Sequence, residues 1–189
     1  MQTKTKQMVG IALFTAIVVV LQLLGGGIKV GTMFSISLVL VPIVVGAAVY
    51  GWKAGAWLGF AFGIAVLLSG DANAFMAVDP LATVGVVLVK GLACGLFSGL
   101  VFTCLGKKNV VVAVIFAAIT CPVVNTGIFL LGCQFFFLDT VSQWAAMYGF
   151  DGAAAYMFLG LAGINFVVEL VVNILLAPVI TRLISYAKK

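Results

Sequence analysis

The stretch from residue 81 to residue 108, LATVGVVLVKGLACGLFSGLVFTCLGKK, decides the fold class of this chain. Residues 81–105 are almost entirely apolar, and a lysine pair, Lys107 and Lys108, follows after one glycine. An apolar run of about 20 residues can cross the roughly 30 Å hydrocarbon core of a bilayer as a helix. The stretch therefore predicts a transmembrane helix with a positively charged end.

Five further apolar runs occupy much of the remaining chain. Apolar residues make up 65% and charged residues 8% of the sequence, and the mean hydropathy is +1.33, all far from the values of soluble domains. The runs are continuous rather than alternating, which favours helices over a barrel. We expect an all-α integral membrane protein with one domain over residues 1–189. The six predicted transmembrane helices cover about residues 8–24, 33–50, 52–69, 81–105, 110–131 and 154–181.

Charges are sorted between the gaps that separate these runs. Eight of the ten basic residues lie at the two ends of the chain or in alternate gaps: Lys4, Lys6, Lys53, Lys107, Lys108, Arg182, Lys188 and Lys189. Four of the five acidic residues lie in the other gaps: Asp71, Asp79, Asp139 and Asp151. Because cytoplasmic loops retain Lys and Arg, both termini are predicted to be cytoplasmic. The net charge of +5 then reflects topology and gives no support to a nucleic-acid partner.

Three polar residues share one height within the predicted helices. Lys90, Asn125 and Asn165 each lie 17 positions from a basic residue at the cytoplasmic end of their own helix. At 1.5 Å per residue, each is about 25 Å from that boundary. The spacing therefore predicts that these side chains meet in the outer half of the membrane.

The last predicted helix adds an acidic residue near this level. Glu169 follows Asn165 by four residues, and Asn173 follows by four more, so the three project from one face. A charge inside the bilayer is costly unless it faces a cavity, a water path or a partner. We therefore predict that Lys90 and Glu169 belong to a binding site. The alternative is a structural ion pair between the two helices.

Further candidates lie beside a proline and in the outer gaps. Asn125 follows Pro122, which bends its helix, so Asn125 either contacts a ligand or satisfies freed backbone groups. Trp144 and Tyr148, four residues apart in the outer segment 132–153, are predicted to stack on a planar ligand, with interfacial anchoring as the alternative. Lys29 lies in the glycine-rich segment 25–31, which has the backbone freedom of a gate.

Small residues recur every fourth position in three predicted helices. Such spacing lets a neighbouring helix approach closely, so we expect tight intramolecular packing along the two glycine series. These series are Gly51, Gly55, Gly59 and Gly63, and Gly91, Gly95 and Gly99. On the first helix, Ala12 and Ala16 form a related pattern near the cytoplasmic end, which indicates a docking surface for another helix.

Together, the AxxxA pattern, the Asp79-Pro80 helix start and the following VKGLACG stretch at 89–95 resemble one known family. The chain is similar, over essentially its whole length, to the substrate-binding S components of energy-coupling factor (ECF) transporters, which take up vitamins in prokaryotes. The resemblance implies that Ala12 and Ala16 contact a transmembrane T subunit in the plasma membrane. It also implies two cytosolic ATPases, because this chain has no phosphate-binding GxxxxGK[ST] loop.

Other functional classes fit the sequence less well. The chain has no histidine, its four cysteines lack CxxC spacing, and no carboxylate pair suits catalysis, so we expect no enzyme, no metal site and no cofactor. A stand-alone secondary transporter or small channel is the alternative, with Lys90 and Glu169 as an ion or proton relay. The ligand stays open between pantothenate, riboflavin and a queuosine precursor.

Overall fold

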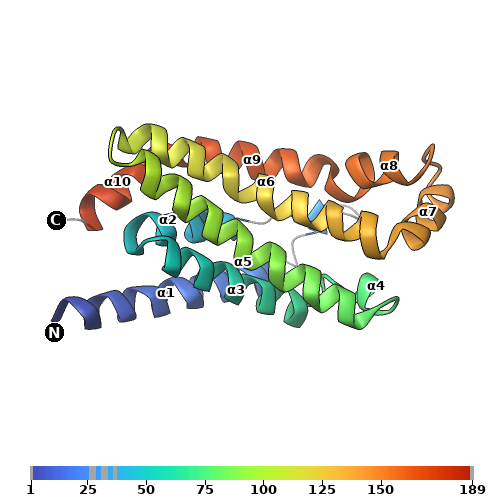
Figure 1. Ribbon diagram of the computed structural model, residues 1–189, viewed down its shortest axis with the longest axis horizontal. Coiled ribbons are helices and arrows are strands. Elements are labelled where there is room, and N and C mark those ends of the chain that lie inside the picture. Colours follow the sequence, from blue (N-terminus) through green and yellow to red (C-terminus); the bar gives the residue numbers. More distant parts are fainter. Residues whose placement is uncertain (1, 26–28, 31–33, 36–37, 188–189) are drawn as a thin grey trace.

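The computed structural model describes residues 2–25, 29–30, 34–35 and 38–187, which form an elongated bundle of helices (Figure 1). Two strands of two residues each pair antiparallel, and the other described elements are helical. In chain order they are α1 (Gln2–Gly25), β1 (Lys29–Val30), β2 (Phe34–Ser35), α2 (Leu40–Tyr50), α3 (Trp52–Ser69), α4 (Asn73–Met76), α5 (Pro80–Leu105), α6 (Val110–Phe136), α7 (Leu138–Met147), α8 (Ala153–Ala155), the π-helical η1 (Tyr156–Ala162), α9 (Gly163–Leu175) and α10 (Ala177–Ala187).

Four of the described helices, α1, α3, α5 and α6, are long and apolar enough to cross a membrane. A fifth candidate span joins Ala153–Ala162 to Asn165–Leu175 with a bend of 43°. The predicted all-α, membrane-type fold is therefore confirmed. The count of six spans is not, because the second and last expected helices differ from the structure.

The second predicted helix, over residues 33–50, begins later than expected. The observed helix α2 covers only Leu40–Tyr50, and strand β2 precedes it. Eleven residues are apolar but too few to cross a bilayer alone. Hydrophobicity alone does not tell a helix from an extended apolar segment over so few residues, which explains the misplaced start.

The last predicted helix, over residues 154–181, is divided into pieces. A π-helical segment, η1, ends at Ala162, and Gly163 adopts a φ of +33°, a conformation that favours glycine. Helix α9 then runs to Leu175, and a turn at Leu176 leads into α10. The apolar run continues through these breaks, so hydropathy did not reveal them.

Helices α3 and α5 meet through their glycine series. A Cβ atom on Gly59 would overlap the backbone carbonyl of Gly91, and one on Gly95 would overlap the carbonyl of Gly55. Close contact of both series within the bundle was predicted, and the structure pairs them with each other. Helix α5 starts as the sequence indicates, because Asp79 caps it by accepting a 3.0 Å hydrogen bond from the Ala82 amide.

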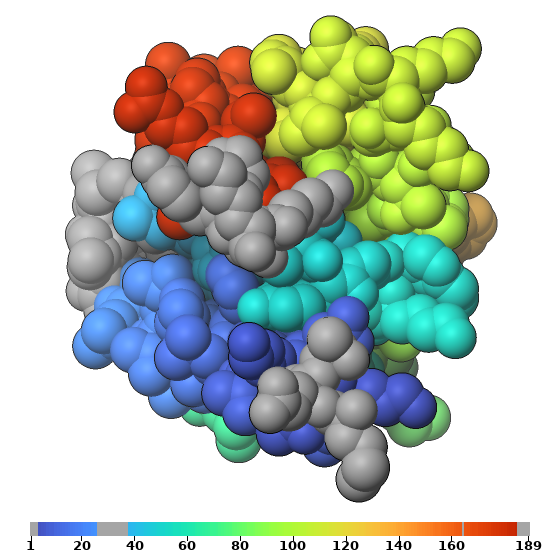
Figure 2. All heavy atoms as spheres, turned by 90° about the vertical axis from the view of Figure 1, so that its left-hand side faces the viewer, coloured from blue at the N-terminus to red at the C-terminus, as the bar shows by residue number. Residues whose placement is uncertain are grey.

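The two ends of the bundle carry different charges. The start of α1, the α2–α3 turn, the α5–α6 turn and α10 gather at one end, which faces the viewer in Figure 2. Lys53, Lys107 and Lys108 are exposed there, whereas α4 and α7 lie at the opposite end with the exposed Asp71 and Asp139 nearby. The charge sorting of the sequence therefore corresponds to two opposite ends of the fold.

Candidate functional site

A cavity of about 260 Å³, here called the central cavity, lies among α5, α6 and α9. Residues from α1 and α3 complete its wall, and it extends to Asp71, Phe75 and Phe137 beside α4 and α7. Small-molecule sites usually measure about 300–1,000 Å³, so this volume suits a compact ligand. The cavity therefore lies toward the acidic end of the bundle.

The structure brings four of the predicted site residues together in the central cavity. Lys90 comes from α5, Asn125 from α6, and Asn165 and Glu169 from α9. Their common height follows from the rise of the three helices from the same basic end. The site is thus assembled from helices that are far apart in the sequence.

The two opposite charges at this level do not pair directly. Glu169 is buried, with 5% of its surface exposed, and the Lys90 ammonium lies 5.2 Å from the centroid of the Phe129 ring. Among the described residues, no ion pair joins Lys90 to Glu169, although both line the central cavity. The two side chains therefore share the central cavity without a direct contact between their charged groups.

The α9 stripe orients Glu169 from both sides. Asn165 donates through Nδ2 to Glu169 Oε1 at 3.5 Å, a long contact that leaves most of the carboxylate's accepting capacity free. One turn further, Asn173 donates to the backbone carbonyl of Glu169 at 2.8 Å. Asn173 does not line the central cavity, so it supports the helix while Asn165 and Glu169 face the cavity.

Asn125 presents an unused acceptor to the central cavity. Its side chain is 7% exposed, and its Oδ1 atom accepts no hydrogen bond from the described residues. A buried amide oxygen without a donor costs free energy, so this atom suits a ligand N–H or O–H group.

Gln22 and Asp71 form a polar contact at another part of the wall. The Gln22 side chain, 5% exposed, donates to Asp71 Oδ2 at 2.5 Å and to Ser69 Oγ at 3.3 Å. Gln22 belongs to α1, whereas Ser69 and Asp71 lie at and after the end of α3. This contact ties the outer part of α1 to the cavity wall.

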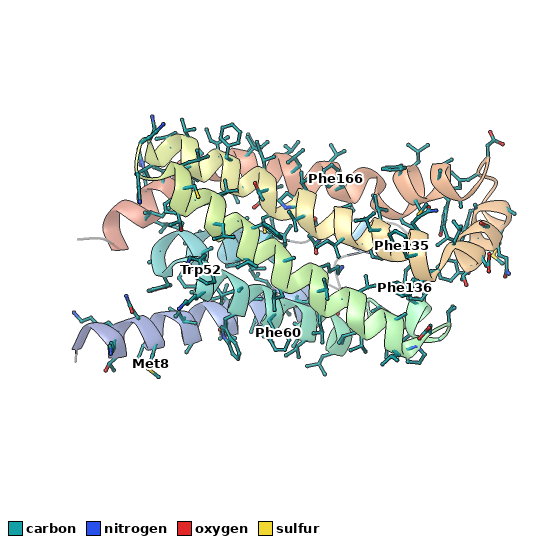
Figure 3. The ribbon with its side chains drawn as sticks, in the orientation of Figure 1. Met8, Trp52, Phe60, Phe135, Phe136 and Phe166 are labelled. Carbon is teal, nitrogen blue, oxygen red and sulfur yellow. The ribbon has the colours of Figure 1, made fainter. Side chains whose placement is uncertain are left out.

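The rest of the wall is rich in aromatic rings, which come from Phe62, Phe75, Phe129, Phe137 and Phe166. Phe75 packs edge-on against Phe129 and Phe137, with centroid distances of 5.5 and 5.1 Å. Figure 3 labels Phe166 on α9, alongside α6. Flat apolar walls with a few convergent polar groups are typical of sites for ring-bearing ligands.

The aromatic pair of the outer segment lies behind this wall. The expected loop is largely helical, because α6 continues to Phe136 and α7 follows. Trp144 packs against Phe75 at 5.2 Å, and Tyr148, 51% exposed, stacks on Tyr156 at 5.7 Å. Neither Trp144 nor Tyr148 lines the central cavity, so any ligand contact by this pair requires a rearrangement of α7.

Two other predicted surfaces lie outside the cavity wall. The proposed gate over residues 25–31 falls mostly outside the described residues. The backbone of Lys29 belongs to β1, whereas its side chain is not part of the described structure. Ala12 and Ala16 are both exposed near the middle of α1. The predicted docking surface is thus separate from the cavity.

Most wall residues were not primary candidates from the sequence, and Gln22 and Phe75 show two different reasons. Gln22 lies 16 positions after Lys6, so the same measurement of height along the helix would have placed it beside Lys90. Phe75 carried no periodic signal, because it lies in the short helix α4 between two spans. Its position depends on packing against α6 and α7, which no local pattern encodes.

Comparisons with known proteins agree with this architecture. A family model described as the substrate-specific component of ECF transporters matches residues 6–181. Among solved structures, ThiT from Listeria monocytogenes has a similar fold, with a TM-score of 0.69 and 21% sequence identity over 97% of this chain and 96% of that chain. No curated protein matches the sequence. At that level of identity the structural likeness concerns the fold.

Proposed function

Because this chain belongs to the family of ECF transporter substrate-specific components, we propose that it captures a vitamin-like ligand in the central cavity and passes it to ATP-driven partner subunits. Members of this family are membrane-embedded transport subunits rather than enzymes. The observation that carries the proposal is the meeting of Lys90, Asn125 and Glu169, from three helices, in one aromatic-walled cavity. Such a buried polar cluster is functional by default in a membrane protein.

The proposed topology has six spans with both termini in the cytoplasm of a prokaryote. In it, α2 and the segment before it form the second span, and the pieces from α8 to α10 form the sixth. The basic end that contains both chain ends supports this orientation, because Lys and Arg are retained on the cytoplasmic side. The central cavity then opens toward the outer face, where a captured ligand would arrive.

The proposed partners are a transmembrane T subunit and two cytosolic ATPases. Ala12 and Ala16, exposed near the middle of α1, are proposed to contact the T subunit. Small residues on an exposed helical face permit a close helix–helix approach within the bilayer. The pair is exposed and lies outside the wall of the central cavity, which supports docking to an energising partner.

The ligand is proposed to contact Lys90, Asn125, Asn165 and Glu169. Trp144, Tyr148 and Lys29 are proposed as further ligand contacts, made by Trp144 and Tyr148 after a movement of α7 and by Lys29 from the glycine-rich segment. Pantothenate, riboflavin and a queuosine precursor are the starting candidates.

Reconstitution into liposomes tests this function. Native mass spectrometry of the purified chain first identifies the ligand that it retains. We expect the lone chain to bind that ligand without transporting it, and uptake to require the T subunit, both ATPases and ATP. Uptake by the lone chain under an ion or proton gradient would refute the proposal and establish the secondary-transporter alternative.

A further inference from the structure

The charge balance of the central cavity restricts the ligand that it accepts. Its wall contains the acidic side chains of Glu169 and Asp71 and the basic side chain of Lys90, so two acidic groups and one basic group face the space for the ligand. The Gln22 amide covers part of the Asp71 carboxylate. Glu169, the deeper acid, receives only the 3.5 Å contact from Asn165. An anionic ligand would therefore meet more repulsion than attraction.

The neutral hydrogen-bonding groups of the cavity also favour a ligand that donates hydrogen bonds. Asn125 Oδ1 and the Glu169 carboxylate have capacity to accept hydrogen bonds from the cavity. Two neutral donors in the wall are already engaged: the Thr83 hydroxyl donates to the Asp79 carbonyl at 2.7 Å, and the Gln22 amide donates to Asp71. Because buried polar groups need partners, the ligand must supply N–H or O–H donors at Asn125 and Glu169.

Lys90 is the main exception to this bias. It lies against the Phe129 ring, whose face attracts a cation, and it forms no ion pair with the described residues. A carbonyl or ring nitrogen on the ligand would satisfy it without adding a full negative charge. Five phenylalanine rings around these polar groups favour a flat ligand body.

We propose that the central cavity recognises a small ring-bearing amine, of zero or positive net charge, with N–H donors directed to Glu169 and Asn125 and an acceptor directed to Lys90. This inference rests on the proposed function, of which it names the substrate class. Lys90 on its own would indicate a carboxylate ligand, and the proposal disfavours such ligands. The deciding feature is that Glu169 and Asp71 share the cavity with that lysine.

Three indole compounds that differ in one group provide matched probes: tryptamine is cationic, tryptophol is neutral and indole-3-propionate is anionic. Isothermal titration calorimetry on the full chain in lipid nanodiscs, after dialysis to remove retained ligand, measures each affinity. We expect tryptamine to bind most tightly and indole-3-propionate least. Absence of tryptamine binding at roughly 1 mM, or an acid that binds as tightly as the amine, would overturn the proposal.

Variants of the cavity assign this preference to residues. Glu169→Gln should weaken tryptamine binding about 10-fold to 100-fold, the effect of losing one charge-assisted hydrogen bond, and should narrow the gap to indole-3-propionate. Asp139→Asn removes an exposed carboxylate on α7, outside the cavity, and should change neither affinity. Unchanged tryptamine affinity in Glu169→Gln would contradict the assignment.

A second variant covers the case in which Glu169→Gln does not fold. Lys90→Met removes the cavity's positive charge, so it should raise tryptamine affinity and reduce that of indole-3-propionate. Weaker tryptamine binding together with tighter indole-3-propionate binding in Lys90→Met would overturn the proposal. These outcomes are separable from the proposed function: a chain that prefers the acid, yet delivers ligand only with ATPases, is still an S component with a different substrate class.

Discussion

Replacing Gly95 by alanine should destabilise the bundle at the contact between α3 and α5. A methyl group at this position would overlap the backbone carbonyl oxygen of Gly55, which has no rotamer through which to move away. Real Cβ atoms essentially never approach another heavy atom within 3.0 Å, so the two helices must separate. The change is thus a test of backbone-to-backbone packing.

The size of the effect follows from two opposing contributions. Overpacking of a rigid contact costs about 1–3 kcal/mol, and the clash with backbone on both sides places Gly95→Ala near the upper value. Alanine in place of a helical glycine returns about 1 kcal/mol. The net loss is about 2 kcal/mol, which for a chain of this size lowers the melting temperature by about 4–8 °C.

Thermal unfolding of the purified protein, followed by circular dichroism, measures this loss. Gly85→Ala is the matched control, because Gly85 lies on the same helix and a Cβ atom there would meet nothing within 4 Å. The control should leave the melting temperature unchanged or raise it. Equal melting temperatures for Gly95→Ala and Gly85→Ala would refute the close-packing explanation.

Three further changes test the site and its surroundings. Asn125→Leu removes the unpaired buried acceptor, so it should weaken binding of the retained ligand about tenfold while stability is kept or raised; unchanged affinity in calorimetry would exclude Asn125 as a contact. Gln22→Leu breaks the contact between α1 and the end of α3 and should lower the melting temperature by a few degrees, and no shift on heating would mean that this hydrogen bond contributes nothing. The double variant Ala12→Leu with Ala16→Leu should reduce co-purification of the T subunit without changing ligand affinity. The control Val20→Leu, at another exposed position of α1, should preserve the complex. A loss of ligand affinity in the double variant would argue against a docking role.

Helices with strong boundary signals could be predicted closely from the sequence. The helix at 52–69 was placed with its observed bounds, and Asp79 with Pro80 marked the start of α5. The second span was misplaced because its apolar run continues through residues that are not helical. Gly163 divides the last span through its own backbone conformation, which cannot be predicted from hydropathy.

The polar part of the site could be predicted because residue spacing gives the height of a side chain along each helix of the bundle. Lys90, Asn125 and Asn165 share a level for that reason, and Glu169 lies one turn away on the same face. The aromatic part depends instead on how α4 and α7 fold back over the bundle. Phe75 reaches the cavity through that tertiary arrangement, which leaves no periodic trace in the sequence.

Helix α1 joins the cavity to the surface proposed for the partner. Gln22 holds its outer part to Asp71 in the cavity wall, Trp57 donates a 3.1 Å hydrogen bond to Thr15 at mid-height, and Ala16 lies exposed beside Thr15. Two binding sites that share one helix are subject to thermodynamic linkage. If ligand binding shifts α1, the ligand changes the free energy of partner binding. Partner binding then changes the free energy of ligand binding by the same amount. A ligand that strengthens partner binding through this helix is therefore itself held more tightly in the complex, so release of the cargo needs a further input, which the ATPases would supply.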